Sequence, residues 1–346
     1  MKKYIVIGGG GYLGYVVVLE LLKRRYHPIV VVVLPGEKVP QLKGLDVLIV
    51  YGNILDKKFL EELIVPNSVV FHLAGIVDIG SSKNNLIYEV NVLGAKNVID
   101  TCISNRVEKL TYTSSVHTIV PSKKGQIMTE PTRFEINQLV GDYAKSKAMA
   151  TTYLLEKTQT ENLNGVVVYP SGIIGPYDFH LSHFGQVVMD YINHKLTAYL
   201  KGGYNFVDVR DVASGVVNAY EKGRSGEGYL LTGEYITLKQ LFQYLNEKLK
   251  RYKMPTKIAS WLIRIVMPFA ELHYRIRKKK PIFSSYSLYT LNINSEFDYQ
   301  KAKKELGFHP RPIKESIFDM VDWFFDNKKE LILPKYRLNL KKTNNV

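Results

Sequence analysis

Short apolar runs rich in β-branched residues recur through the first half of the chain and predict buried strands. They are Tyr4 to Ile7, Pro28 to Leu34, Leu45 to Tyr51, Ser68 to Gly75 and Lys109 to Ser115. Longer mixed stretches separate them and predict helices, such as Ile87 to Ser104 and Gly141 to about Glu156. Because strands alternate with helices, we expect an α/β fold whose doubly wound parallel sheet is covered on both faces.

The alternation becomes less regular after Pro176, which predicts a second, smaller C-terminal α/β domain. We expect residues 1–175 to form the first, larger domain, with a helix at 207–222 returning to it. Residues 176–206 and 223–327 should form the smaller domain, in which Thr237 is the expected cap of a helix. Residues 328–346 are interpreted as a loose basic tail.

Residues 257–280 combine the most apolar segment of the chain with a basic end, Arg275-Ile-Arg-Lys-Lys-Lys280. Such a segment can lie on a membrane surface, where basic residues meet anionic lipid. Arg264 and Pro268 argue against a membrane span. We favour a helix that lines the substrate pocket or a homodimer interface over peripheral membrane contact.

Three glycines directly follow the first predicted strand, Gly8, Gly11 and Gly14, at the spacing Gly-x-x-Gly-x-x-Gly. An apolar stretch with a basic end, Tyr15 to Arg25, continues from them as a predicted helix. The glycines permit a tight turn and close backbone approach, and a helix N-terminus offers free N–H groups to a pyrophosphate. Strand, glycine turn and helix therefore predict a dinucleotide-binding site.

The fifth predicted strand ends in hydroxyl side chains, Thr113-Ser-Ser115, at the sheet edge where ligands bind in such folds. Tyr143 and Lys147 follow, four residues apart and so on one face of a helix. A tyrosine can donate a proton to a ketone oxygen if a lysine cation lowers its pKa, normally about 10. A serine hydroxyl can hold the same oxygen. The set predicts hydride-transfer chemistry at a carbonyl group.

In these motifs the chain resembles the extended short-chain dehydrogenase/reductase family, which includes NAD-dependent epimerases and dehydratases, from residue 1 to about 327. It is most similar to the dihydroflavonol-4-reductase-like and 3β-hydroxysteroid-dehydrogenase-like branch. Further matching segments are Phe71-His-Leu-Ala74, Asn91-Val-Leu-Gly-Ala95 and Tyr169 to Pro176. The resemblance implies an oxidoreductase in which residues 1–175 form an NAD(P)-binding Rossmann domain and the smaller domain binds the substrate.

The resemblance also implies roles for individual residues. Ser115, Tyr143 and Lys147 take the catalytic positions, and Asn91 is a further catalytic candidate. The implied cofactor contacts are Gly8, Gly11, Tyr12, Leu13, Gly14, Lys38, Asn53, Ile54, Leu73, Ala74, Gly75, Tyr143, Lys147, Pro170 and Ile173. No metal site is expected.

The form of the cofactor depends on the loop after the second strand. A carboxylate there favours NAD by binding the ribose 2′-hydroxyl, and an Arg favours the 2′-phosphate of NADP. NADP-using reductases of this branch commonly carry Arg where this chain has Leu34, and Glu37 and Lys38 follow in the loop. The resemblance and Lys38 together favour NADP slightly, with NAD as the alternative.

Composition limits the remaining possibilities. The 346 residues are 46% hydrophobic and 23% charged, which is enough to bury a full core. The net charge of +15 comes from dispersed Lys and Arg residues without a nucleic-acid motif, so no nucleic-acid partner is expected. Cys102 is the only cysteine, which agrees with a reducing, cytoplasmic location. We expect no signal peptide, since the first strand begins at residue 4, and no membrane span.

Three functions are compatible with these features. We favour an NAD(P)-dependent oxidoreductase that acts on a small, partly apolar ketone, aldehyde or alcohol. Between Gly175 and Phe206 the only cations are Lys195 and Lys201, and the aromatic residues include Phe179, Phe184, Tyr191 and Tyr199. A sugar-nucleotide epimerase or dehydratase is the alternative. A dinucleotide-sensing regulator without catalysis is disfavoured by the intact Ser-Tyr-Lys set.

Overall fold

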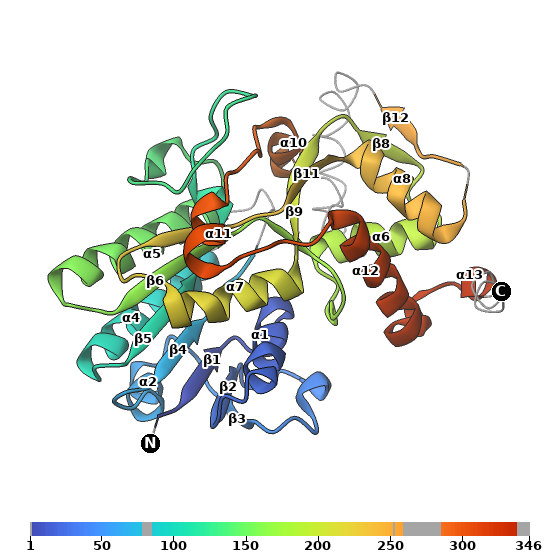
Figure 1. Ribbon diagram of the computed structural model, residues 1–346. Helices are drawn as coiled ribbons and strands as arrows, with labels where there is room; N and C mark the ends of the chain where they lie inside the picture. The colour runs from blue at the N-terminus through green and yellow to red at the C-terminus, as the bar shows by residue number, and fades with distance from the viewer. Residues whose placement is uncertain (1, 78–84, 252, 259–284, 338–346) are drawn as a thin grey trace.

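The computed structural model describes residues 2–77, 85–251, 253–258 and 285–337. Within these residues, seven parallel strands form the sheet of the larger lobe (Figure 1). In spatial order they are β10 (Gly228–Leu231), β6 (Gly165–Pro170), β5 (Lys109–Thr113), β4 (Val69–His72), β1 (Tyr4–Ile7), β2 (Ile29–Val33) and β3 (Leu48–Tyr51). The winding direction reverses at β1, the place where doubly wound sheets bind ligands. This confirms the predicted fold class.

Each face of the large sheet buries its own apolar core, because successive side chains of a strand point to opposite faces. Tyr4 and Val6 pack on one side with α1 (Tyr12–Lys23), α7 (Val209–Lys222) and α11 (Gln300–Leu306). Ile5 and Ile7 pack on the other with α2 (Lys57–Leu63), α4 (Ala95–Ser104) and α5 (Asp142–Thr160). Continuous apolar runs such as β2 suit strands that are covered on both faces.

A smaller lobe is built mainly from the second half of the chain. Its strands form two small sheets, one of β7 (Gly172–Ile174), β9 (Gly203–Asp208) and β11 (Glu234–Thr237), the other of β8 (Ala198–Leu200) and β12 (Thr256–Ile258). A third apolar core joins these strands to α6 (His183–Ile192), α8 (Leu238–Leu249) and α12 (Ile313–Asn327). Thr237 caps α8 through a capping box with Gln240, as the sequence predicts. α10 (Ser285–Asn292) packs beside β9.

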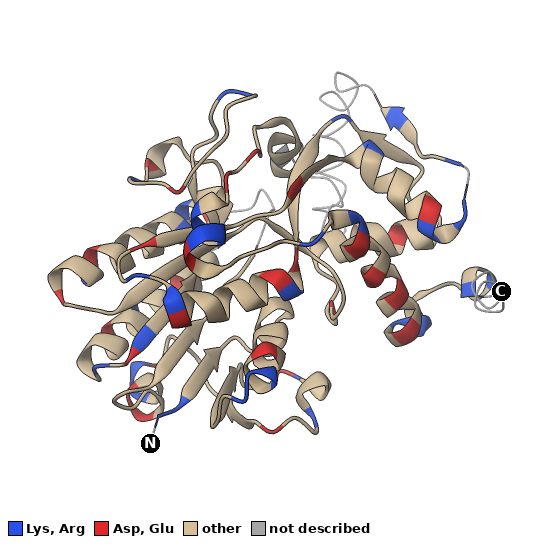
Figure 2. Cartoon of the chain, in the orientation of Figure 1, with Lys and Arg blue, Asp and Glu red and all other residues tan. Residues whose placement is uncertain are grey.

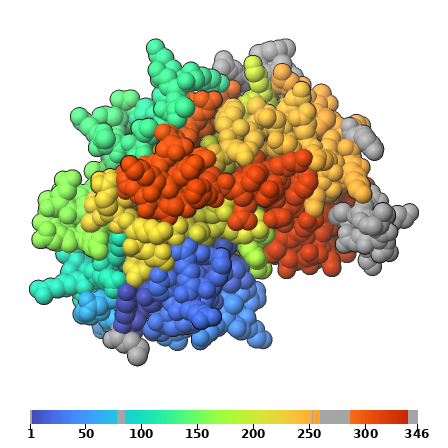
Figure 3. Space-filling model, in the orientation of Figure 1, coloured from blue at the N-terminus to red at the C-terminus, as the bar shows by residue number. Residues whose placement is uncertain are grey.

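One expected boundary differs from the structure. The sequence places residues 223–327 in the smaller domain, but β10 pairs in parallel with β6 at the edge of the large sheet. α11 then packs against α7 and β10 (Figure 1). In Figure 3 the red-orange surface of this late segment lies beside the yellow surface of α7, and the blue surface of the N-terminal part lies next to both. The apolar pattern of a strand reveals that it will be buried but not which sheet it joins.

Residues 329–337 form short turns that pack on the smaller lobe, which differs from the loose tail expected for this part of 328–346. The segment contains a 3-10 turn, Lys329–Leu331, and a helical turn, α13 (Pro334–Arg337), with Ile332 fully buried between them. Asn193 anchors it: Nδ2 donates to the Leu331 carbonyl at 2.9 Å, and Oδ1 accepts from the Leu333 nitrogen at 2.8 Å. Residues 338–346, and 259–280 of the apolar and basic segment, lie outside the described residues.

Charged side chains of both signs are interspersed along the elements of both lobes (Figure 2). Several of them are paired, as Arg311 is with Asp211 at 2.7 Å and Arg210 with Asp208 at 2.8 Å. The Arg311 pair joins the segment before α12 to α7 and so helps to hold the two lobes together. Across the described part of the chain, no helix has the length and apolar character that crossing a bilayer requires.

Candidate active site

Gly8 and Gly11 lie in the tight turn between β1 and α1, and Gly14 packs against this turn from the start of α1. Gly8 has a φ of +88°, and a Cβ there would lie 2.7 Å from the Ala74 nitrogen. A Cβ on Gly14 would lie 2.1 Å from the Gly8 carbonyl oxygen, and one on Gly11 would lie 3.3 Å from it. Gly11 directly precedes α1, where the free N–H groups of the helix begin. The glycine turn therefore fits the pyrophosphate of a dinucleotide.

The ends of β1 and β4 meet beside this turn. The Leu73 and Ala74 nitrogens both donate to the last carbonyl of β1, at 3.0 and 2.9 Å. A Cβ on Gly75 would lie 3.2 Å from Asn91 Oδ1 and 3.5 Å from Lys147 Nζ. A continuous set of contacts thus leads from the glycine turn, along the end of β4, to the lysine of the predicted catalytic set.

Four of the predicted cofactor contacts lie around the start of α1 and the ends of β6 and β7. The Tyr12 hydroxyl donates to the Gly175 carbonyl at 2.8 Å, which ties the start of α1 to the segment after β7. Leu13 and Ile173 are partly buried and pack against the apolar core that the large sheet forms with α1, α7 and α11. Pro170 is buried as the last residue of β6. Tyr12 therefore has a structural contact of its own, and cofactor binding by these four side chains stays a prediction.

Asn53 and Ile54, the predicted adenine contacts, lie in the loop after β3. Asn53 Oδ1 accepts from the Leu55 nitrogen at 3.0 Å, so this side chain shapes its own loop. Ile54 is buried beneath Gly94, where an added Cβ would lie 2.5 Å from the Ile54 Cδ1. Lys38 is exposed on the loop after β2. The structure gives Ile54 a packing role, while contacts of Asn53 and Lys38 with a cofactor stay predictions.

Asn91 lies in a π-helical turn, η2 (Glu89–Gly94), between α3 (Asn85–Tyr88) and α4. Its Oδ1 accepts from the Ile76 nitrogen at 2.8 Å. Its Nδ2 donates to the Ile76 carbonyl at 3.0 Å and to Ser146 Oγ at 3.1 Å, so both amide protons are used. Asn91 therefore holds Ile76, in the segment after β4, against α5, and its catalytic role stays a prediction.

The predicted catalytic residues Ser115, Tyr143 and Lys147 lie together just beyond the end of β5 and on the first turns of α5, and all are buried. The Tyr143 hydroxyl forms a hydrogen bond with the Ser115 side chain. Lys147 Nζ donates to the Thr113 carbonyl at 2.6 Å and to the Tyr112 hydroxyl at 3.3 Å. The set therefore occupies the carboxyl edge of the sheet, as the strand and helix pattern predicts.

Burial dominates the charge states of this set. It raises the pKa of Tyr143, and the hydrogen bond with Ser115 opposes that rise. It lowers the pKa of Lys147 from 10.5 to about 7. The Tyr-x-x-x-Lys motif predicts that the lysine cation pulls the pKa of Tyr143 downward, but the net shift in this structure is upward. The reason is that desolvation favours the neutral forms of both groups.

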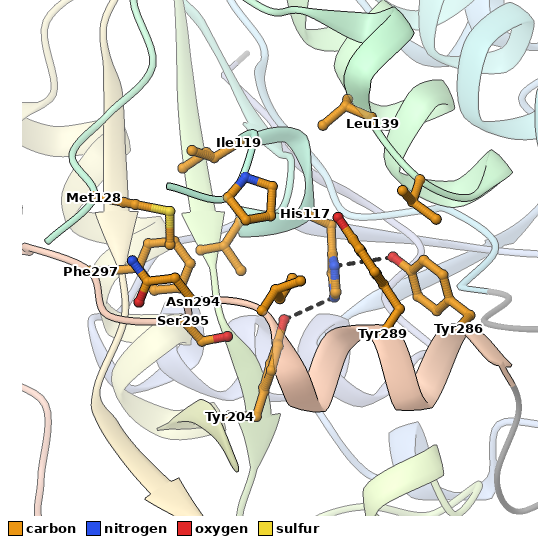
Figure 4. A pocket seen from close by; sticks show the side chains of 14 residues that line it. His117, Ile119, Met128, Leu139, Tyr204, Tyr286, Tyr289, Asn294, Ser295 and Phe297 are labelled. Carbon is orange, nitrogen blue, oxygen red and sulfur yellow. Dashed lines mark hydrogen bonds between the residues drawn. The ribbon is translucent and has the colours of Figure 1, made fainter. Parts of the chain in front are cut away.

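His117, a partly buried histidine two residues after Ser115, is not among the site residues predicted from the sequence. Its Nε2 lies 2.9 Å from the Tyr204 hydroxyl and its Nδ1 lies 3.1 Å from the Tyr286 hydroxyl (Figure 4). Its ring meets the Tyr143 ring nearly edge-on, with centroids 5.9 Å apart. Burial lowers the pKa of His117 to about 4, so the ring is neutral near pH 7. Its place beside the Thr-Ser-Ser motif is the one sequence signal, because its partners come from the distant β9 and α10.

His117 and the two tyrosines line a small pocket (Figure 4). Most other lining side chains are apolar or aromatic, including Val116, Ile119, Pro121, Met128, Leu139, Val140, Tyr289, Ile293 and Phe297. The neutral imidazole carries one N–H and each tyrosine one O–H, and two of these three protons fill the two hydrogen bonds. One O–H is left over from this hydrogen-bonded chain and can donate to an oxygen acceptor.

Three features define an extended short-chain dehydrogenase/reductase: the doubly wound sheet, the glycine turn where its winding reverses, and the Ser-Tyr-Lys set at the same edge. The chain belongs to the 3-beta hydroxysteroid dehydrogenase/isomerase family, whose model matches residues 5–222. It is therefore an enzyme of the oxidoreductase class in an NAD(P)-dependent family. This confirms the resemblance that the sequence motifs indicate.

Two curated relatives cover nearly the whole chain. Sterol demethylase protein B of Methylococcus capsulatus is 27% identical over 327 residues, covering 92% of this chain and 97% of that protein. Sterol-4-alpha-carboxylate 3-dehydrogenase, decarboxylating, of Mus musculus is 26% identical over 331 residues, covering 89% and 87%.

Solved structures share the fold. The crystal structure of gox2253 matches with a TM-score of 0.81 at 28% identity, over 94% of this chain and 98% of that chain. The dTDP-glucose 4,6-dehydratase DesIV from Streptomyces venezuelae, solved with NAD bound, matches with a TM-score of 0.75 at 19% identity, over 95% and 98%.

Proposed function

We propose that this chain transfers a hydride between NAD(P) and the alcohol or carbonyl carbon of a small, partly apolar substrate. The observation that carries the proposal is the convergence of two features at one sheet edge. The glycine turn lies against the end of β4, and Gly75 at that end lies against Lys147, which belongs to the buried set with Ser115 and Tyr143. When bound, the nicotinamide ring supplies or accepts the hydride.

The side chains of the set divide the remaining work. The Ser115 hydroxyl holds the substrate oxygen by donating a hydrogen bond to it. Tyr143 accepts the proton of an alcohol during oxidation and returns it during reduction. Because burial raises the pKa of Tyr143, its phenolate needs a nearby cation. The protonated form of Lys147 would supply it, and a pKa of about 7 leaves part of the lysine in that form near neutral pH. Asn91 acts indirectly by holding the loop after β4 against α5.

The pocket beside Tyr143 supports an apolar substrate rather than a nucleotide sugar. A diphosphate calls for cations, and the residues that line this pocket include no Lys or Arg among those the structure describes. The lining instead offers aromatic rings and the neutral hydrogen-bonded chain through His117. Relatives that are named for sterol chemistry agree with this choice. We therefore extend the proposal to a ring alcohol or ketone of sterol-like character.

The test is a screen in both directions: reduction of NAD⁺ and NADP⁺ by 3β-hydroxysteroids and simple ring alcohols, and oxidation of NADH and NADPH by dihydroflavonols and ring ketones, with UDP- and dTDP-sugars included. On any active substrate, Tyr143→Phe should lower turnover about 10²–10⁴-fold, since one positioned proton donor is lost. Tyr153→Phe is the matched control: it lies on the same helix, and its hydroxyl bonds Asp100 at 2.6 Å. Normal turnover by Tyr143→Phe would contradict the proposal. Conversion of a sugar nucleotide without net nicotinamide reduction would support the epimerase or dehydratase alternative.

A further inference from the structure

The loop after β2 brings an acidic side chain back to the end of that strand. The Glu37 nitrogen donates to the Leu34 carbonyl at 3.0 Å, and Gly36 between them has a φ of +82°. Pro35 and Gly36 occupy the two central positions, where a type II turn favours proline and requires a positive φ. The Glu37 carboxylate then accepts from the Leu34 nitrogen at 3.1 Å. The Pro-Gly turn thus holds Glu37 at the carboxyl end of β2, three residues beyond Leu34.

The same carboxylate borders the glycine turn. Glu37 Oε1 lies 2.6 Å from the position that a Cβ on Gly10 would take. The Gly8 and Gly9 nitrogens donate to the Val32 carbonyl at 3.0 and 3.3 Å, so the glycine turn is bonded directly to the end of β2. Glu37 therefore stands where β2 and the glycine turn meet.

This place decides what Glu37 can recognise. In doubly wound folds the adenosine ribose of the cofactor lies at the carboxyl end of β2. A carboxylate has about four lone-pair positions, and the Leu34 nitrogen uses one of them, so others can accept hydrogen bonds from ribose hydroxyls. A phosphate ester on the 2′-oxygen would bring a charge of about −1.5 to −2 to the same place. The carboxylate would repel it.

Lys38 is the competing influence, because its ammonium group would attract a 2′-phosphate. Its side chain is exposed, whereas Glu37 is partly buried and held by a backbone N–H group. An exposed ion pair formed by a long side chain contributes little, since salt screens it and ordering the side chain costs entropy. The ordered carboxylate should therefore outweigh the exposed lysine.

We propose that Glu37 makes this enzyme select NAD over NADP, which reverses the preference that Lys38 and the family resemblance suggest. The inference rests on the proposed function only because both take the glycine turn as a dinucleotide site. It depends on neither the substrate nor the Ser-Tyr-Lys set.

The test is calorimetric titration of NAD⁺ and NADP⁺ into the purified protein without substrate. The wild-type chain should bind NAD⁺ at least about tenfold more tightly, as the loss of hydrogen bonds to a charged group implies. Glu37→Gln keeps the side-chain shape and removes the charge, so the ratio of the two affinities should fall about ten- to a hundredfold. Glu62→Gln, which removes the same charge from an exposed position on α2, should leave the ratio unchanged.

A second variant covers the case in which Glu37→Gln does not fold. Gly36→Ala leaves every charge in place, and a Cβ there meets nothing within 4 Å, so it disturbs the turn only through the φ of +82°. It should also narrow the preference for NAD⁺. Tighter binding of NADP⁺ by the wild type, or an unchanged ratio in folded Glu37→Gln, would overturn the inference. Binding of neither dinucleotide would overturn the proposed function as well, whereas NAD⁺ binding without any turnover would count against the proposed function alone.

Discussion

Replacing Gly14 by alanine should distort the glycine turn from inside the protein. The new methyl group would lie 2.1 Å from the Gly8 carbonyl oxygen and 2.8 Å from the Gly9 Cα. Favourable contact needs about 3.5 Å, so α1 must move away from the end of β1 by more than about 1 Å. The obstructing atoms belong to the backbone, which leaves no side chain free to rotate away.

The expected cost follows from two opposing terms. Overpacking of a close-packed site costs about 1–3 kcal/mol, and the upper end applies here because the obstruction is backbone. Alanine recovers up to about 1 kcal/mol through its higher helix propensity. The free energy of unfolding should therefore fall by about 2 kcal/mol. Dinucleotide affinity should fall too, since the N-terminus of α1 is displaced from the turn.

Gly11→Ala is the matched control. Its Cβ would lie 3.3 Å from the same Gly8 oxygen, a gap that a shift of a few tenths of an ångström relieves. Gly11 is the N-cap of α1, where alanine is a poorer residue than glycine, so a loss below about 1 kcal/mol is expected. Dinucleotide affinity should nevertheless fall, because the added methyl group lies where the pyrophosphate must approach.

Urea unfolding followed by circular dichroism, together with NAD⁺ titration by calorimetry, separates the two effects. Gly14→Ala should lose both stability and binding, and Gly11→Ala mainly binding. A Gly14→Ala protein within about 0.5 kcal/mol of the wild type, the usual range for a neutral surface change, would refute the packing argument. So would a larger loss of stability in Gly11→Ala than in Gly14→Ala.

Two further predictions concern the buried polar groups near Tyr143. Because the pKa of Lys147 falls from 10.5 to about 7 in the folded state, the unfolded chain binds more protons between these values and stability should rise with pH there. The free energy of unfolding should rise by up to about 1.4 kcal/mol per pH unit in this range. Urea unfolding at several pH values should show a smaller rise in Lys147→Met. An equal rise in both proteins would contradict the lowered pKa of Lys147. Asn91→Leu should lower the free energy of unfolding by about 1–3 kcal/mol, because the polar groups of Ile76 and Ser146 lose their hydrogen-bond partner. A stability equal to that of the wild type would show that these hydrogen bonds contribute nothing.

The sequence was sufficient for the parts of the fold that depend on local pattern. β1, β2 and β4 form from runs of apolar residues, and the glycines after β1 form the turn that their spacing predicts. Ser115, Tyr143 and Lys147 also come together as expected, because the first follows directly after the end of a strand and the others share a helix face. In each case a short segment carries all of the relevant information.

Features that depend on distant partners could not be predicted in the same way. His117 bonds tyrosines from β9 and α10, and no property of its own segment identifies them. The upward shift in the pKa of Tyr143 reflects how deeply α5 is buried, which the Tyr-x-x-x-Lys spacing does not encode. Glu37 is intermediate: the Pro-Gly turn that returns it to β2 can be read locally, but its contact with Gly10 needs the folded chain.

The edge position of β10 bears on how the protein folds while it is being synthesised. The ribosome releases the other strands of the large sheet first, whereas β10 and its covering helix α11 follow only around residues 228 and 300. Until then the outer edge of β6 presents unpaired N–H and C=O groups, a template for joining another strand. A nascent or proteolysed chain that ends after α7 would keep this open edge and be prone to aggregate. The nucleotide-binding lobe therefore completes its sheet only with strands made late, so its maturation depends on the rest of the chain.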